Sequence, residues 1–199
     1  MVGLAQSLGQ ITVVYVYSVT VPLGLSYRGI DMTRYAVPDN DASPGAWAPN
    51  TGSDLFEMIN EAPAAVDGDY ISVTDDMSGA KEVTFRLTDV PTPDTGTRTV
   101  LVRASEDGGM DSITLTVTLK EGGVSKGSQA FSSGFGSVAD LTFNITSSIS
   151  DYSDLTLVIS AEDGMGGTST TIYQAHFLVP EPAAATASPR ALKHLIYYY

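Results

Sequence analysis

The chain has 199 residues, of which 43% are hydrophobic, and its formal net charge is −13. This hydrophobic fraction can supply the core of one domain with extensions, and it excludes wholesale disorder. The excess of acidic residues repels phosphate, which argues against nucleic acid as the partner. The chain contains no cysteine, so disulfides and thiolate chemistry are excluded.

The charge is concentrated in the middle of the chain. Residues 44–180 hold 19 of the 23 acidic residues and six of the ten basic ones. Residues 1–27 carry no charged side chain, and residues 190–199 are apolar and basic. An acidic body with uncharged or basic ends is typical of a subunit that is held by its ends. We therefore expect an N-terminal arm and loop (1–43), a β-sandwich domain (44–180), and a linker with a C-terminal tail (181–199).

No targeting or membrane segment is predicted. The N-terminus lacks the basic region and the cleavage site of a signal peptide. The apolar stretch at residues 11–25 is shorter than the roughly 20 residues that span a bilayer, and Pro22 and Gly24 interrupt it. We expect no membrane partner, and a location in the cytoplasm or in a particle assembled there.

The first half of the chain contains one predicted strand and one short predicted helix. Residues 10–21 are rich in β-branched and aromatic side chains, which favours an extended strand. Residues 36–52, with repeated proline and glycine, are predicted to form a loop. Residues 53–60 are the best helix candidate, one or two turns long, with Ser53 as the N-cap.

From residue 69 onward the pattern predicts β structure. Residues 113–119 alternate most clearly, with four apolar residues on one face and three threonines on the other. The glycine- and serine-rich residues 122–136 are predicted to be a long connection of the kind a Greek key or jelly roll uses. Short strands with almost no helix predict an all-β, antiparallel, jelly-roll-like sandwich. The predicted strands cover residues 69–73, 82–87, 98–103, 113–119, 140–146, 155–160 and 169–179.

The sequence offers little catalytic chemistry. It has two histidines, His176 and His194, and no Gly-x-Ser-x-Gly nucleophile elbow. We interpret His176 as a partly buried or edge-strand histidine on the same side of its strand as Ile172 and Leu178. Two histidines without cysteine argue against a zinc site. We predict no catalytic residue, no cofactor and no metal.

Two further features have a structural and a functional interpretation. Acidic turns such as Asp67-Gly-Asp69 could offer oxygen ligands to calcium, but none has the spacing of a calcium loop, and Asp and Gly are ordinary turn formers. Whether they bind calcium stays open. Trp47 is the only tryptophan, and it is either a sugar-stacking platform or a plug at one end of the sandwich. We favour the plug.

Both ends of the chain are predicted to contact other subunits. The N-terminal run offers backbone donors and acceptors to a neighbouring sheet edge. The basic residues of the tail would meet acidic surface on a neighbour. The alternative is that residues 11–21 form the first strand of their own sandwich and that the tail is loose. The predicted interface residues are Ile11, Val13, Tyr15, Tyr17, Arg190, Lys193, Leu195, Ile196, Tyr197, Tyr198 and Tyr199.

Several motifs in the body resemble a recurrent β-rich structural protein of tailed bacteriophages. They cover about residues 45–179 and include Trp-Ala-Pro-Asn-Thr-Gly-Ser-Asp-Leu-Phe at 47–56, Ile-Asn-Glu at 59–61, Asp-Gly-Asp-Tyr-Ile at 67–71, Thr-Gly-Thr-Arg-Thr-Val-Leu-Val-Arg at 95–103, residues 113–123 with their Leu-Lys-Glu-Gly-Gly ending, and Asp-Tyr-Ser-Asp-Leu at 151–155. The resemblance implies a non-enzymatic component of the head or tail, with no catalytic residue to transfer.

These observations together favour a phage virion protein that decorates or cements the capsid, assembled in the host cytoplasm. Its expected partners are other virion proteins, above all the major capsid protein and copies of itself. The alternative function is a tail-fibre or carbohydrate-binding β-sandwich module, which would use Trp47 and the acidic loops for a glycan. A hydrolase on a β-sandwich ranks third.

Overall fold

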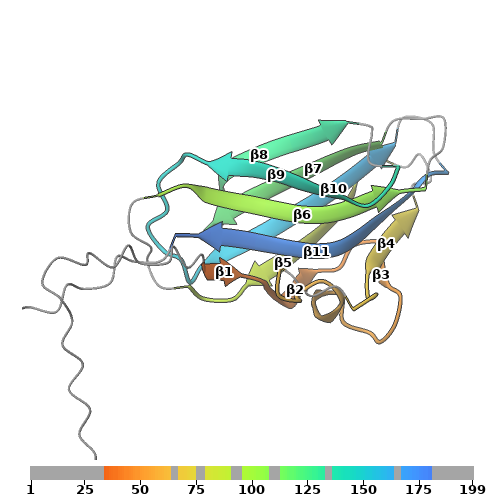
Figure 1. The fold of residues 1–199 in the computed structure, drawn as a ribbon, viewed down its shortest axis with the longest axis horizontal. Helices are drawn as coiled ribbons and strands as arrows, with labels where there is room; N and C mark the ends of the chain where they lie inside the picture. Colours follow the sequence, from red (N-terminus) through yellow and green to blue (C-terminus); the bar gives the residue numbers. More distant parts are fainter. Residues whose placement is uncertain are drawn as a thin grey trace, which may run out of the picture.

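A computed structural model describes residues 34–63, 67–74, 79–90, 96–107, 113–132, 136–163 and 167–180. These residues form eleven strands and a single 3-10 turn. The strands build two antiparallel sheets that lie against each other as a sandwich (Figure 1). The predicted all-β, antiparallel, jelly-roll-like sandwich is therefore confirmed for this part of the chain.

We call the two layers sheet A and sheet B. Sheet A has the order β3-β4-β11-β6-β9, and β1 pairs with the C-terminal end of β11. Sheet B has the order β2-β5-β10-β7-β8. The strands of sheet A are β1 (Arg34–Ala36), β3 (Ala48–Pro49), β4 (Ile71–Thr74), β6 (Arg98–Glu106), β9 (Ala139–Ile145) and β11 (Ser169–Val179), and those of sheet B are β2 (Pro38–Ser43), β5 (Lys81–Leu87), β7 (Ile113–Glu121), β8 (Val124–Ser132) and β10 (Leu155–Asp163).

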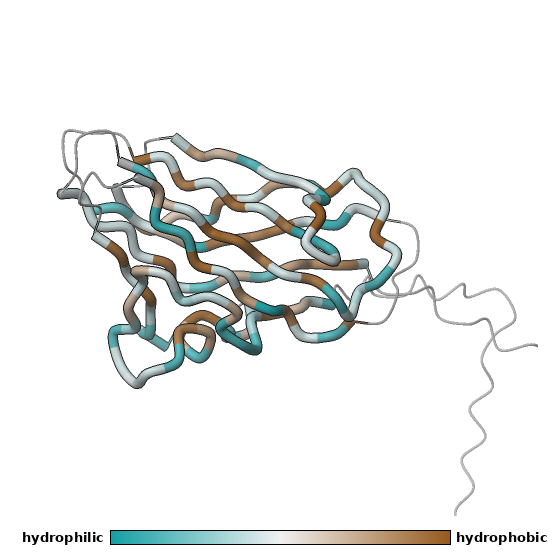
Figure 2. The backbone as a smooth tube through the Cα atoms, turned by 180° about the vertical axis from the view of Figure 1, so that it is seen from behind, coloured by the Kyte–Doolittle hydropathy of each residue, from teal (hydrophilic) through white to brown (hydrophobic). Residues whose placement is uncertain are grey.

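The core lies between the sheets and follows the period-2 pattern of the sequence. Side chains alternate between the two faces of a strand, so one apolar set per strand can be buried. Figure 2 shows this alternation of hydrophobic and hydrophilic residues along the strands. The predicted core face of β7 is confirmed, because its four apolar residues are at most 1% exposed: Ile113, Leu115, Val117 and Leu119.

Three strands occupy segments for which the sequence predicts loops. β8 fills most of the predicted connection at 122–136, and both β2 and β3 lie within the predicted loop at 36–52. β8 was missed because its residues are mostly polar and exposed on both faces, which leaves no apolar alternation to detect. Because β1 and β2 pair with β11 and β5, residues 34–43 belong to the sandwich and not to an arm.

The predicted helix is reduced to one 3-10 turn, η1 (Phe56–Met58). The side chain of Ser53 does not cap it. Instead, the carboxylate of Asp41 in β2 accepts hydrogen bonds from the backbone N–H groups of Leu55 (2.7 Å) and Phe56 (2.8 Å). The predicted cap is wrong because the partner comes from a distant strand, which local spacing cannot reveal.

The part of the chain that the structure describes contains no helix with the length and apolar character of a membrane crossing. The predicted strand at residues 10–21 and the linker and tail at 181–199 lie outside the described residues. Those expectations stay predictions.

The facing of β7 can be tested with a buried charge. We expect Val117→Asp to lower the free energy of unfolding by about 3 kcal/mol or more, because Val117 is fully buried between the sheets. Urea unfolding measures the change. Thr116→Asp, on the opposite face of β7, is the control and should cost much less; equal losses for the two variants would contradict the assigned facing.

Candidate functional site

A β-bulge in β11 decides which side chains face outward from sheet A. Ile172 pairs with Ala104, and the next pair is Gln174 with Arg103, so Tyr173 is an extra residue in the strand. A bulge reverses the alternation beyond it. As a result Ile172 and Phe177 both lie in the core although they are five positions apart.

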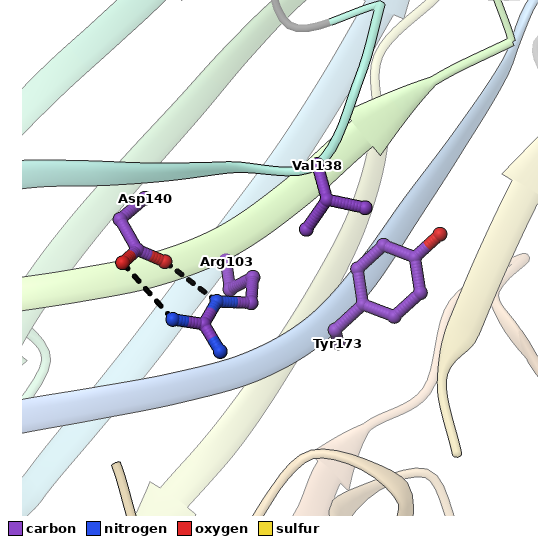
Figure 3. A pocket seen from close by; sticks show the side chains of 4 residues that line it. All are labelled: Arg103, Val138, Asp140 and Tyr173. Atoms are coloured by element: carbon purple, nitrogen blue, oxygen red, sulfur yellow. Dashed lines mark hydrogen bonds and ion pairs between the residues drawn. The ribbon is translucent and has the colours of Figure 1, made fainter. Parts of the chain in front are cut away.

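The outer face of sheet A carries an open depression of about 360 Å³, lined by Arg103, Val138, Asp140 and Tyr173 (Figure 3). Arg103 in β6 and Asp140 in β9 are direct cross-strand partners. The guanidinium donates two bonds to the carboxylate, Nε to Oδ1 at 2.6 Å and Nη2 to Oδ2 at 3.0 Å. This pairing lowers the pKa of Asp140 and raises that of Arg103.

The ring of Tyr173 forms the opposite side of the depression. Its hydroxyl lies 3.2 Å from the hydroxyl of Ser105, and its ring lies 5.9 Å from the ring of Tyr70 at a tilted angle. Val138 completes the lining and is 53% exposed. The site therefore presents one aromatic ring, one exposed aliphatic side chain and one bidentate ion pair on an open surface.

Residues 59–62 support this face from one edge of β11. β4 and β1 pair with the two ends of this edge and leave the middle to residues 59–62. There the N–H of Ala175 donates to the carbonyl of Ile59 at 3.1 Å, and the side-chain amide of Gln174 donates to the carbonyl of Ala62 at 3.3 Å. The irregular segment therefore takes the place of a strand.

His176 is fully buried under the same segment, whereas the sequence pattern suggests partial burial or an edge position. Because of the bulge it also faces the side of the strand opposite to Ile172. Its Nε2 donates to the carbonyl of Glu61 at 2.5 Å, and the ring of Tyr35 packs edge-on at 5.8 Å. Burial is the main cause that lowers the pKa of His176. The buried ring has a structural role in holding residues 59–62.

Glu61 is an acid whose unusual environment has no signal in the sequence. Both carboxylate oxygens are buried. Burial is the main cause that raises the pKa of Glu61 from 4.5 to about 7, and the negative charges of Asp67 and Asp69 act in the same direction. The side chain therefore titrates near neutral pH.

Trp47 has the structural role that we favoured. It is 5% exposed, and its indole N–H donates to the carbonyl of Lys81 at 3.1 Å. A sugar cannot stack on a buried ring, so the stacking interpretation of Trp47 is wrong.

The acidic turns make local hydrogen bonds where the structure describes them. The carboxylate of Asp67 accepts from the N–H of Asp69 at 2.9 Å, and that of Asp151 accepts from the N–H of Ser153 at 2.9 Å. Among the described residues, no three histidine or acidic side chains are grouped so that they could hold a metal ion. The turn interpretation accounts for these bonds.

The predicted interface residues lie outside the described part of the chain: Ile11, Val13, Tyr15, Tyr17, Arg190, Lys193, Leu195, Ile196, Tyr197, Tyr198 and Tyr199. Their role and the virion hypothesis that depends on them stay predictions. The depression involves none of these residues. Arg103 and Asp140 lie at outward positions of two correctly predicted strands, but the sequence does not show that these strands pair.

Comparison with known proteins gives no family assignment. No family model matches the chain, and no curated protein matches it. Among solved structures, the arabinose-bound α-L-arabinofuranosidase MgGH51 is 18% identical with a TM-score of 0.41, over 72% of this chain. This chain spans only 24% of the length of that enzyme.

Two smaller structures are covered almost completely. The module TmCBM61, in complex with β-1,4-galactotriose, is 10% identical with a TM-score of 0.42, over 75% of this chain and 88% of the module. A family 11 carbohydrate-binding module from Clostridium thermocellum is also 10% identical, with a TM-score of 0.39, over 75% of this chain and 98% of the module. At these values the likeness carries no inference about what this chain binds.

The raised pKa of Glu61 predicts a pH-dependent stability. A carboxyl that holds its proton more tightly in the folded state stabilises the fold fully below pH 4.5, and this stabilisation is lost as the pH rises through about 7. We expect Glu61→Gln, which cannot ionise, to unfold at a higher urea concentration than the wild type at pH 8.5 and at a similar one at pH 4.5.

The control for this prediction is Glu57→Gln, which replaces an exposed acid in η1. Glu57→Gln should follow the wild type across the pH range. If the unfolding midpoint of Glu61→Gln changes between pH 4.5 and 8.5 as much as that of the wild type, the carboxyl does not titrate as described.

Proposed function

We propose that this domain is a non-catalytic module that binds a neutral glycan in the depression on the outer face of sheet A. The observation that carries the proposal is the half-buried ring of Tyr173 beside the bidentate Arg103–Asp140 pair. The proposal keeps the carbohydrate-binding alternative from the sequence but moves the stacking ring from Trp47 to Tyr173.

The chemistry of the lining fits a sugar. A sugar ring offers apolar C–H groups that pack on an aromatic face, and hydroxyls that both donate and accept hydrogen bonds. A guanidinium has five N–H donors. Two of its nitrogens bind Asp140, and Figure 3 shows the third outside these two bonds. Arg103 and Asp140 neutralise each other, so the pair favours a neutral ligand rich in hydroxyl groups over an ion.

The shape of the depression favours part of a longer chain over an isolated small molecule. Pockets that enclose small ligands have volumes of roughly 300–1,000 Å³ and cover most of the ligand surface. This depression, at about 360 Å³, is at the lower end of that range and lies open on a sheet face. It would cover one side of one or two sugar units while the chain continues along the surface.

The state of the acids supports binding without cleavage. Glycoside cleavage uses two carboxyl groups about 5–9.5 Å apart, one of which must carry a proton as the general acid. Asp140 is the carboxylate among the described lining residues, and Arg103 lowers its pKa. Glu61 has the raised pKa that an acid needs, but its oxygens are buried.

Removal of the Tyr173 ring tests the proposed glycan binding. We expect Tyr173→Ala to weaken glycan binding about tenfold, which corresponds to about 1.4 kcal/mol of lost ring contact. Tyr173→Phe keeps the ring and should bind like the wild type. Affinity electrophoresis in gels with a panel of neutral polysaccharides, and one acidic polysaccharide for comparison, measures the effect.

Val124→Ala is the control, because Val124 is a 65% exposed hydrophobic residue in β8 and does not line the depression. It should not change the mobility in any gel. Failure of the wild type to bind any neutral polysaccharide, or unchanged binding by Tyr173→Ala, would contradict the proposal.

A further inference from the structure

The outer edge of β8 is an unprotected strand edge. β8 has nine residues and pairs with β7 on one side, and the described residues place no strand on its other side (Figure 1). Natural edge strands avoid further pairing by being short, by bulges, or by carrying proline or charges. β8 is long, lacks proline, and carries one charge, that of Lys126, whose ammonium group binds Glu121.

The other described edges are better protected. β1 and β3 have only three and two residues, and β3 ends in Pro49. β2 begins with Pro38, contains two aspartates, and has two register shifts against β5. β9 is shorter than β8, with seven residues against nine. An added strand would therefore pair most easily with β8.

An apolar seam lies along this edge, between β8 and β9. The rings of Phe131 in β8 and Phe143 in β9 approach to 6.5 Å, and both are only partly buried against the core. Gln129, which pairs with core-facing Val117, is nevertheless exposed. Sheet A therefore does not cover the inner face of β8 completely.

We propose that residues 10–21 of the same chain add to the outer edge of β8 as an antiparallel strand. This run has no charged residue, and its odd positions are all apolar. Such a face would cover the seam, while the even positions, which hold four polar residues and two valines, would face solvent. The odd positions are Ile11, Val13, Tyr15, Tyr17, Val19 and Val21.

The connection has the required length and direction. Arg34 pairs with Val179 at the C-terminal end of β11. In the neighbouring strand β6, Arg98 pairs with Ile145. Ile145 in turn faces Gly127, which lies in the first half of β8. The chain therefore enters the sandwich at the end where β8 begins, so a run arriving there is antiparallel to β8. The two edge strands of a five-stranded sheet lie about 19 Å apart. The twelve residues 22–33 can span up to about 40 Å, which is enough to reach the edge.

The same molecule is favoured over a second copy for two reasons. A tether longer than the span holds the run near its edge at an effective concentration in the millimolar range, far above ordinary protein concentrations. Exchange between copies would in addition bring together two chains that each carry a net charge of −13. The free edge thus favours the alternative in which residues 11–21 belong to their own sandwich.

Disulfide trapping in the full chain tests the pairing, because the natural sequence has no cysteine. Ala130→Cys in β8 is combined with Val14→Cys, Val16→Cys or Ser18→Cys, at solvent-facing positions of the run. After mild oxidation of dilute protein, at least one pair should form an intramolecular disulfide that migrates faster in a gel without reductant. Thr142→Cys in β9, with the same three partners, is the control and should give less than about a tenth of that yield.

A predominance of covalent dimers, equal yields with Thr142→Cys, or no yield above the control would each overturn the proposal. Hydrogen exchange gives an independent measurement. Val16→Pro removes a backbone donor from the run and should accelerate amide exchange in β8, whereas Leu23→Pro in the connection should not. Unchanged exchange in Val16→Pro would also overturn it.

Discussion

One extra residue in β11 governs the arrangement of sheet A. Without the bulge at Tyr173, the alternation set by Ile172 would place His176 between the sheets and Phe177 in solvent. With the bulge, Ile172 and Phe177 are both buried, and Tyr173 lies on the outer face beside the strand that carries Arg103. The interruption of the ladder is thus compensated by burial of a large aromatic side chain.

An irregular segment packs against the edge of β11 that lies opposite β6. On this edge β4 and β1 pair only with the two ends of β11. Residues 59–62 provide carbonyl groups to the stretch between them, and Asp41 fixes the turn that precedes this segment. The cost is the burial of the carboxyl group of Glu61, which keeps its proton until about neutral pH. Support of the outer face and pH-dependent stability therefore have a common origin.

The fold was predictable where one face of a strand is apolar and buried. β7, β10 and β11 satisfy that condition, and residues 155–160 and 169–179 were assigned to strands within a few residues of their observed bounds. β8 does not satisfy it, because it is held by backbone pairing through the tight turn at Gly122 and Gly123, whose positive φ values allow a two-residue hairpin. Backbone pairing leaves almost no side-chain signal, so polar edge strands look like loops.

The candidate site could not be predicted from the sequence, for a different reason. Each member is ordinary alone: Arg103 and Asp140 are outward residues of two strands, 37 positions apart, and Tyr173 is one of ten tyrosines. Their combination depends on the pairing of β6 with β9 and on the position of one bulge, and neither has a local sequence pattern. Trp47 attracted attention as the only tryptophan, but a rare aromatic residue next to prolines serves a core as readily as a ligand. Tyr173 is the more informative aromatic residue, because the bulge in β11 places it on the outer face of sheet A.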